Sequence, residues 1–216
     1  MDLNIVGISG SPVRNGNTDS FLDYMLTYSK NYDAKAQAVY LSELEISDCV
    51  HCNFCISKQK KNKYCTHDDD AQLVFEMVEK ADILILASPV HFMRTSSLLA
   101  SFIDRLRVFV FGNVAGGRLK NKLGVSAAVA WARHGGLETT HLSHIYAFMT
   151  LEMIPVSARK CISPMGASAM SGAAGQRTAK PDQKSGIKLD KAGLHSAQVI
   201  VDRAVELANL MKPKLG

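Results

Sequence analysis

Four of the five cysteines in the chain lie close together, between Cys49 and Cys65. Cys49, Cys52 and Cys55 are each separated by two residues, a spacing that lets one turning stretch of backbone present three thiolates to a single iron–sulfur cluster. The fourth ligand of such a run is normally more distant in sequence, and Cys65, separated from Cys55 by nine residues, is the candidate. The spacing therefore predicts a metal or redox centre on a loop at about residues 43–67.

The same four cysteines are also compatible with zinc, with a dithiol or with inert packing. Four thiolates suit tetrahedral Zn²⁺, although zinc sites more often use two separated C-x-x-C pairs. A redox-active dithiol would need two cysteines rather than four. Buried, inert cysteines would need apolar surroundings, whereas this loop also carries Lys58, Lys60, Lys61 and Lys63. We therefore favour an iron–sulfur centre over zinc, and we interpret the isolated Cys161 as an ordinary packed or loop residue.

Length, composition and charge set the broad class of the protein. The 216 residues predict one domain over 1–216, and 47% hydrophobic with 21% charged residues is ordinary for a soluble protein. A net charge of +5 does not by itself indicate nucleic acid, the N-terminus MDLNIVGISGS has no basic region of a signal peptide, and the apolar run ADILILASPV is too short for a membrane. We expect a cytoplasmic protein with no nucleic-acid or membrane partner, whose thiols stay reduced.

Apolar runs and helical periodicities alternate about five times along the chain, which predicts a parallel sheet with helices on both faces. We expect strands at about 3–9, 36–41, 82–87, 123–130 and 153–156, and helices at 18–30, 71–80, 96–107, 137–150 and 189–211. In the helix at 71–80, the side chains expected to face the core are Leu73, Val74, Met77 and Val78. Residues 161–187 interrupt the alternation, and we interpret them as a solvated loop or as an arm over an active site or a neighbouring subunit.

Ligands of open parallel sheets bind beyond the carboxyl ends of the strands, and the loop after the first strand has an anion-binding character. Its hydroxyls, amide and cation are supplied by Ser9, Ser11, Arg14, Asn17 and Thr18, and it opens directly into a helix whose N–H groups attract anions. Neither a G-x-x-x-x-G-K-[ST] loop nor a G-x-G-x-x-G fingerprint is present. A monophosphate cradle remains as the prediction, with a simple helix cap as the alternative.

Two more loops are predicted at the same edge of the sheet. After the third strand, S-P-V-H-F-M-R-T-S offers a flat, mostly apolar surface. After the fourth strand, the glycines of A-W-A-R-H-G-G-L-E-T-T let the backbone approach a ligand closely. Each loop is a weak signal alone, but the three together favour a planar, phosphorylated cofactor.

The stretches GSPVRNGNT, ASPVHF and ARHGGLETT resemble the three FMN-contacting loops of the flavodoxin-like NAD(P)H-dependent oxidoreductases. The cysteine run after the second strand resembles the iron–sulfur flavoprotein branch of that family, although the gap before Cys65 is longer than is usual there. The resemblance covers about residues 1–150. It implies a flavodoxin-like three-layer α/β sandwich with a five-stranded sheet in the order 2-1-3-4-5, FMN, a [4Fe–4S] cluster, and a homo-oligomer (dimer or tetramer).

The resemblance also implies a role for each candidate site residue. The phosphate of FMN would be bound by Ser9, Ser11, Arg14, Asn17 and Thr18. One side of the flavin ring would be lined by Pro89, Val90, His91 and Phe92. The polar edge of the ring would meet the loop formed by Ala132, Arg133, His134, Gly135 and Gly136. The cluster would be bound by Cys49, Cys52, Cys55 and Cys65. No residue is expected to act as a catalytic acid or base, because the cofactors supply the chemistry.

Three functions follow from these features. The first is electron transfer between a one-electron carrier such as ferredoxin and an acceptor, through the cluster and FMN. The second is an NAD(P)H-dependent FMN reductase acting on quinones, flavins or a small organic substrate, with structural metal at the cysteines. The third is a zinc-bearing binding protein without enzymatic activity. The four lysines between Cys55 and Cys65 would raise the potential of a cluster and steer an acidic carrier towards it.

Overall fold

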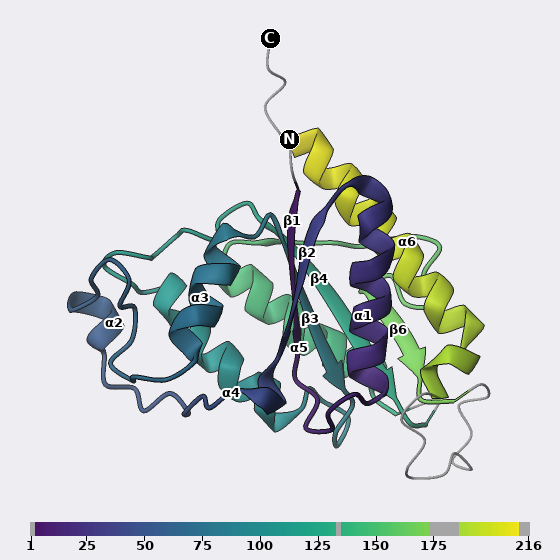
Figure 1. Ribbon diagram of the computed structural model, residues 1–216, viewed down its shortest axis with the longest axis horizontal. Coiled ribbons are helices and arrows are strands. Elements are labelled where there is room, and N and C mark those ends of the chain that lie inside the picture. The colour runs from purple at the N-terminus through teal and green to yellow at the C-terminus, as the bar shows by residue number, and fades with distance from the viewer. Residues whose placement is uncertain (1–2, 133–134, 173–185, 212–216) are drawn as a thin grey trace.

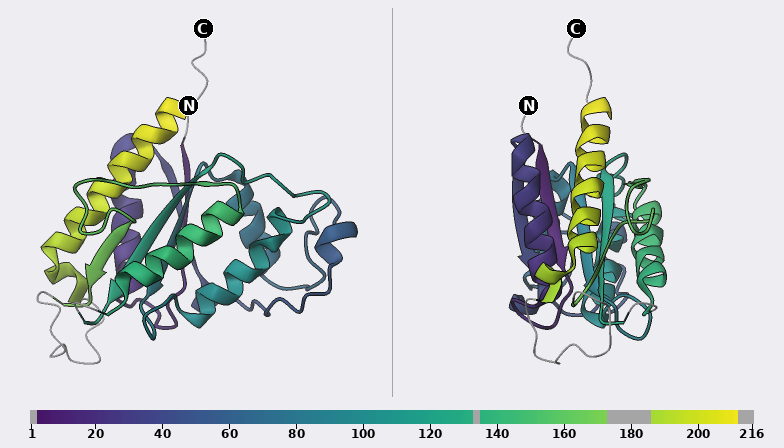
Figure 2. Two further views of the ribbon diagram at one scale, coloured as in Figure 1. Left: turned by 180° about the vertical axis from the view of Figure 1, so that it is seen from behind. Right: turned by 90° about the vertical axis from the view of Figure 1, so that its right-hand side faces the viewer.

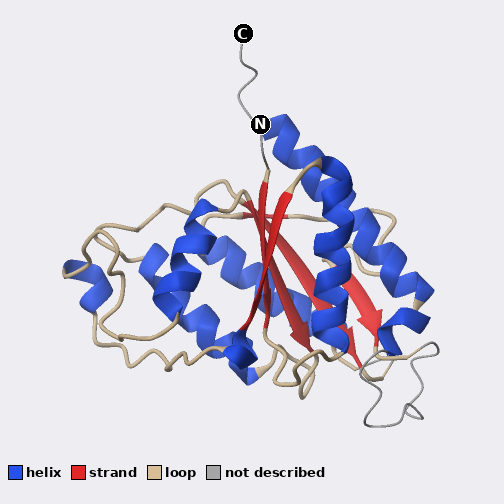
Figure 3. Cartoon of the chain, viewed as in Figure 1, coloured by secondary structure: helices blue, strands red, loops and turns tan. Residues whose placement is uncertain are grey.

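One parallel β-sheet forms the centre of the protein (Figures 1 and 3). The computed structural model describes residues 3–132, 135–172 and 186–211. The strands are β1 (Asn4–Ser9), β2 (Lys35–Tyr40), β3 (Ile83–Pro89), β4 (Leu123–Ala130), β5 (Ile154–Pro155) and β6 (Ala167–Met170). Their order is β2-β1-β3-β4-β5, with β6 also paired to β4, and every pair is parallel. The predicted flavodoxin-like order is therefore confirmed.

The edge of the sheet beyond β4 differs from the prediction. The expected strand at 153–156 is only two residues long, because β5 pairs just with Leu123 and Gly124 at the beginning of β4. The other end of β4 is covered by β6, which pairs with 127–130. Part of the segment 161–187 is therefore a strand of the sheet, and our interpretation of it as a loop or arm is wrong for these residues; 173–185 lie outside the described residues.

Helices cover both faces of the sheet, which makes three layers (Figures 1 and 2). One face is covered by α1 (Asn17–Ser29) and α6 (Lys191–Met211), which pack against each other. The other face is covered by α3 (Ala71–Lys80), α4 (Ser97–Arg105) and α5 (Leu137–Thr150). The short helices are α2 (Phe54–Ser57), η1 (Lys30–Tyr32), η2 (Leu41–Glu43), η3 (Leu106–Phe109) and η4 (Gly186–Leu189). None of the described helices is long and apolar enough to cross a membrane.

The buried face of α3 is shifted by one residue from the face that we predicted. Its buried side chains are Ala71, Val74, Phe75 and Val78, which follow the i, i+3, i+4, i+7 pattern of a helix face. Leu73 was expected in the core but is 65% exposed, because a helix turns its side chains by about 100° per residue and Phe75 occupies the inner position. On α1, by contrast, the predicted inner face is confirmed from Phe21 to Ser29.

A fully buried polar network joins β4, α5 and β6. Ser126 Oγ on β4 lies 2.7 Å from Nδ1 of both His141 and His144. His141 Nε2 lies 2.8 Å from Ser168 Oγ on β6, and His144 Nε2 lies 3.1 Å from Thr95 Oγ1. Since the single hydroxyl proton of Ser126 can serve only one imidazole, the other must donate from Nδ1. The network thus fixes α5 to the sheet with both rings neutral.

We expect these two histidines to make the protein sensitive to acid. Burial lowers the pKa of His141 to about 4, and burial, with a smaller contribution from His141, lowers the pKa of His144 to about 3. The unfolded chain binds protons at these rings below about pH 6.5 and the folded protein does not, so the free energy of unfolding falls as the pH drops through this window. The free energy of unfolding, measured by urea denaturation, should be lower by about 3 kcal/mol per histidine at about pH 4 than at neutral pH.

Substituted proteins separate this effect from that of the acidic residues. His144→Gln removes one titrating ring, so its unfolding free energy should depend less steeply on pH. The matched control is His195→Gln, because His195 is exposed and lies outside the buried network. If the unfolding free energy of His144→Gln depends on pH as steeply as that of the wild type, the acid sensitivity does not come from this histidine.

Candidate functional site

The three predicted cofactor loops follow β1, β3 and β4 and lie together at one edge of the sheet (Figure 1). Ser96, the N-cap residue of α4, joins two of them: its hydroxyl donates to the Gly10 carbonyl oxygen at 2.6 Å, and its N–H donates to Ser88 Oγ at 2.9 Å. A side chain at Gly10 would meet Leu99 of the same helix at 2.3 Å. The N-terminus of α4 is therefore held against the first and second loops by hydrogen bonds and close packing.

The first loop is organised by Asp19, a residue that the sequence patterns did not single out. Its buried carboxylate accepts a hydrogen bond from Ser9 Oγ at 2.5 Å and further bonds from the backbone N–H groups of Asn15 and Gly16. Burial raises the pKa of Asp19, and these donors offset part of that rise. Ser11 Oγ donates to the Val13 carbonyl oxygen. The hydroxyl protons of Ser9 and Ser11 thus shape the loop, so the donors that remain available to an anion are mainly those of its backbone and of α1.

The other predicted phosphate residues differ in position. Thr18 is buried in the first turn of α1, where an anion-binding N-terminus places its donors. Asn17 Oδ1 accepts from the Ile187 backbone N–H at 2.8 Å, so this side chain also fastens the chain before α6 to the loop. The guanidinium of Arg14 is exposed and donates to the Ser42 carbonyl oxygen at 3.1 Å.

The second loop contains a tight turn in an unusual backbone conformation. His91 and Arg94 exchange backbone hydrogen bonds at 3.0 Å, and the two residues between them, Phe92 and Met93, have φ of 48° and 60°. Left-handed φ at both central positions is costly for residues other than glycine. Phe92 is moreover fully exposed, and Pro89 and Val90 are half-buried. Strain combined with an exposed aromatic ring is typical of a ligand-binding turn.

The third loop packs directly against the second. Gly136 has φ of 101°, and a Cβ there would lie 2.4 Å from Met93 Cα, so only glycine fits. Thr139 Oγ1 donates to the Met93 carbonyl oxygen and so fixes the turn to α5. Ala132 and Gly135 are half-buried in this loop, while the predicted residues at 133–134, an arginine and a histidine, lie outside the described residues.

The four clustered cysteines line one small cavity beyond α3 and α4. Cys55 is buried, Cys49 and Cys65 are half-buried, Cys52 is exposed, and no disulfide joins them. Among the described residues, no three Cys, His, Asp or Glu side chains converge on the position of a single ion. His51 and Asn53, between these cysteines, have φ of 52° and 60°. Such left-handed turns form backbone concavities that bind anions, including iron–sulfur clusters.

A buried ion pair closes the base of this cysteine loop. Arg105, at the end of α4, donates from Nη1 and Nη2 to both carboxylate oxygens of Asp69 at 2.8 and 3.1 Å, and Nη1 also donates to the Ser47 carbonyl oxygen. Ser47 precedes the first cysteine and Asp69 follows the last one. Burial would raise the pKa of Asp69, but hydrogen bonds from Arg105 and Ser47 and the charge of Arg105 outweigh it, so the pKa is lowered.

A second anchor holds the lysine-rich part of the loop. Gln59 is 4% exposed, and its side chain donates to the carbonyl oxygens of Tyr64 and Val108 and accepts from the N–H groups of Val114 and Ala115. The lysines themselves remain exposed. The loop is therefore an ordered part of the fold that presents its cations to solvent.

Burial and charge act in opposite directions on the pKa of the Cys55 thiol. Burial raises the pKa of Cys55, and the charge of Arg107 partly offsets this rise. Burial would lower the pKa of Arg105, but Asp69 and Cys65 outweigh it, so the pKa is raised. The cavity thus combines thiols with two permanent cations, and the net effect on Cys55 is a raised pKa, which favours its neutral thiol.

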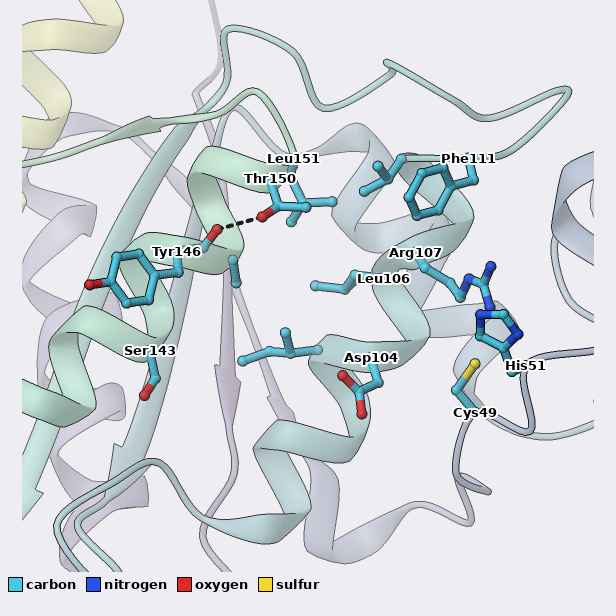
Figure 4. A pocket seen from close by; sticks show the side chains of 13 residues that line it. Cys49, His51, Asp104, Leu106, Arg107, Phe111, Ser143, Tyr146, Thr150 and Leu151 are labelled. Atoms are coloured by element: carbon cyan, nitrogen blue, oxygen red, sulfur yellow. Dashed lines mark hydrogen bonds between the residues drawn. The ribbon is translucent and has the colours of Figure 1, made fainter. Parts of the chain in front are cut away.

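An open groove of about 610 Å³ adjoins the cysteine loop (Figure 4). Cys49 and His51 lie at one end beside Arg107, and Ser143 and Tyr146 of α5 lie at the other. Side chains of α4, η3 and α5 form its mostly apolar wall. One side of the cysteine loop is therefore reachable from outside the protein.

Comparison with known proteins identifies the family. The model of the NADPH-dependent FMN reductase family matches residues 3–167. The chain belongs to this family. The match to an FMN reductase family, together with relatives named as flavoproteins, shows that this FMN reductase homologue is an FMN-dependent oxidoreductase.

Its relatives by sequence include the iron–sulfur flavoprotein MJ0731 of Methanocaldococcus jannaschii, which is 32% identical over 215 residues, covering 99% of this chain and 100% of that protein. An iron–sulfur flavoprotein of Archaeoglobus fulgidus is 27% identical over 213 residues, covering 97% and 98%. These matches confirm the resemblance to the iron–sulfur flavoproteins.

Solved structures confirm the fold of this FMN reductase homologue. RosB with bound 8-demethyl-8-formylriboflavin-5'-phosphate has a TM-score of 0.76 at 14% identity, with 98% of this chain and 81% of that chain covered. A flavodoxin, the WrbA-like protein of Agrobacterium tumefaciens, has a TM-score of 0.65 at 12% identity, with 97% and 99% covered.

Gly136→Ala should weaken FMN binding. The new Cβ would strain a left-handed backbone and displace Met93, at a cost of about 1–3 kcal/mol, which corresponds to roughly a ten- to hundredfold higher Kd. The control is Gly117→Ala, where φ is 77° but nothing lies within 4 Å of the new Cβ. Flavin fluorescence titrations should show weaker binding for Gly136→Ala only. Equal Kd values for Gly136→Ala and wild type would remove the second and third loops from the flavin site.

Proposed function

We propose that this FMN-dependent oxidoreductase transfers electrons between an external one-electron carrier and an acceptor, through a [4Fe–4S] cluster on the cysteine loop and FMN at the sheet edge. The observation that carries the proposal is the gathering of Cys49, Cys52, Cys55 and Cys65 around one cavity. The naming of its relatives as iron–sulfur flavoproteins supports the same centre.

The donor set fits such a cluster. Four thiols from one loop can supply all the ligands that a [4Fe–4S] centre requires. The left-handed turns at His51 and Asn53 and the cations Arg105 and Arg107 suit a negatively charged group. The longer gap before Cys65 is accommodated because Gln59 anchors the intervening lysine-rich segment to the chain after η3.

The flavin edge fits a phosphorylated planar cofactor in the same way. The N-terminus of α1 and the loop held by Asp19 would bind the phosphate, and the turn at Phe92 with the backbone at Gly136 would contact the ring. When bound, FMN supplies two-electron chemistry and the cluster supplies one-electron transfer, so the pair can exchange one kind for the other.

Helix α4 fixes the distance between the two sites. Its first turn is fastened to the flavin loops through Ser96, and its last residue, Arg105, lines the cysteine cavity. A helix of nine residues spans about 13 Å. Both sites thus belong to one rigid element.

The electron carrier that we propose is ferredoxin or a similar acidic protein. Lys58, Lys60, Lys61 and Lys63 are exposed on the loop that would hold the cluster, and Cys52 is exposed beside them in the chain. A positive rim of this kind attracts an acidic partner. A homo-oligomer, dimer or tetramer, completing the flavin edge remains part of the proposal.

Cys52→Ser should abolish the cluster while leaving the flavin in place. The exposed thiol makes no packing contribution comparable to that of Cys55, so the fold should persist. The control is Cys161→Ser, because the Cys161 thiol donates to the Ser196 carbonyl oxygen and lies outside the cavity. Iron and acid-labile sulfide analysis of anaerobically purified protein should show a loss in Cys52→Ser alone. Full iron in Cys52→Ser, or zinc in the wild type, would overturn the proposal and favour an FMN reductase with structural metal.

Reduction by ferredoxin should depend on ionic strength. Steering by the exposed lysines should raise the association rate by about 10- to 1000-fold at low salt. Lys60→Ser with Lys61→Ser should lower that rate and flatten its salt dependence, whereas Lys30→Ser, on the far side of the sheet, should not. A rate that stopped-flow absorbance shows to be independent of salt in the wild type would rule out the steering.

A further inference from the structure

One buried donor in the cysteine cavity makes no hydrogen bond within the described part of the chain. Arg105 is the largest fully buried side chain, 1% exposed, and it lines the cavity together with the four cysteines. Its Nη1 and Nη2 atoms are paired with Asp69 and Ser47. Its Nε atom is buried without a hydrogen-bond partner among the described residues, while the guanidinium as a whole also interacts with the Cys65 thiol.

A second unpaired nitrogen lines the same cavity. His67 Nε2 is also buried without a hydrogen-bond partner among the residues that the structure describes. Buried polar groups in folded proteins are almost always paired, and each exception points to strain or to a missing ligand. Arg105 Nε can only donate, whereas the role of His67 Nε2 depends on its tautomer. The cavity therefore requires a ligand that accepts at least one hydrogen bond.

The chemistry of the wall limits what that acceptor can be. The cavity offers four thiols and two guanidinium groups, so its ligand must combine soft, thiophilic metal with negative charge. A sulfide or thiolate sulfur of an iron–sulfur cluster meets both conditions, and hydrogen bonds to those sulfurs are a known means of setting cluster potential.

We propose that Arg105 donates its Nε–H to a sulfur of the cluster and so holds the midpoint potential of the cluster high. This inference rests on the proposed function. A cation and a donor stabilise the reduced state, which carries one more negative charge than the oxidised state. Asp69 fixes the orientation of the guanidinium and offsets part of its charge. Arg105 therefore links the closure of the loop to the redox property of the centre.

Two substitutions with opposite expected effects on the cluster potential distinguish a role of Arg105 in setting that potential from a purely structural role. Arg105→Lys keeps a positive charge but loses the planar fork with its Nε–H, so the cluster should become harder to reduce. We expect at least a tenfold fall in the equilibrium constant for its reduction, which is 59 mV for one electron. Asp69→Asn keeps Arg105 and removes the offsetting charge, so the potential should rise. The matched control is Arg118→Lys, because Arg118 lies outside the cavity and pairs with Glu79, so the potential should stay near that of the wild type. Arg107→Lys removes the other arginine of the cavity.

Potentiometric titration followed by EPR measures these shifts, and iron and sulfide contents show whether each variant holds its cluster. A direct readout uses ¹⁵N-labelled arginine: pulsed EPR of the reduced cluster should detect a nitrogen coupling in wild type and in Arg107→Lys. The coupling decides the matter even if Arg105→Lys loses its cluster.

The outcomes separate the two claims. A wild-type protein without iron and sulfide would defeat the proposed function itself. A wild-type protein with a cluster but no arginine coupling in Arg107→Lys, or with an unchanged potential in Arg105→Lys, would overturn only the role of Arg105.

Discussion

The buried ion pair between Arg105 and Asp69 is the constraint on which the cysteine loop depends. It ties the two ends of a loop, at Ser47 and Asp69, to the last residue of a helix that belongs to the core of the sheet. Breaking a buried pair of this kind costs about 3–5 kcal/mol because one charge is left unpaired. Four thiols on a long irregular segment are therefore held around one cavity by a strong local contact rather than by a metal alone.

The same helix, α4, connects the two sites that we propose. Its N-cap, Ser96, bonds to the loop after β1 and to the end of β3, while its other end reaches the cysteines. The edge of the sheet that we propose as the flavin site is held by strained and close-packed backbone at Phe92 and Gly136. Electron transfer is sensitive to distance and orientation, so a single rigid helix between two fixed sites suits that task.

Sequence patterns predicted those parts of the fold that rest on local regularity. The apolar runs of β3 and β4 are continuous and the stripe of α1 is periodic, so the parallel sheet and the position of the three loops followed from them. The strand order followed only from the family resemblance. The strand β6 was missed because Ala167–Met170 is short and lacks the β-branched residues that mark a strand. Leu73 was wrongly predicted to be buried, because the apolar residues of a short helix do not define unambiguously which side of the helix faces the core.

Only those residues of the candidate site that lie close together in the sequence could be predicted. The cysteines were recognisable by their spacing, whereas Asp19 and Arg105 act through partners that the fold brings together; Asp69 and Arg105 are 36 positions apart in sequence. Nothing in a lone arginine on an amphipathic helix indicates that it will be fully buried beside four thiols.

Anaerobic reductive titration of the purified protein, followed by visible absorption, tests the central claim most directly. A chain that holds one FMN and one [4Fe–4S] cluster takes up about three electrons, two at the flavin and one at the cluster. Our account predicts this number, with the flavin bands and the broad iron–sulfur absorption bleaching together. Uptake of about two electrons, with no absorbance beyond that of flavin, would contradict it.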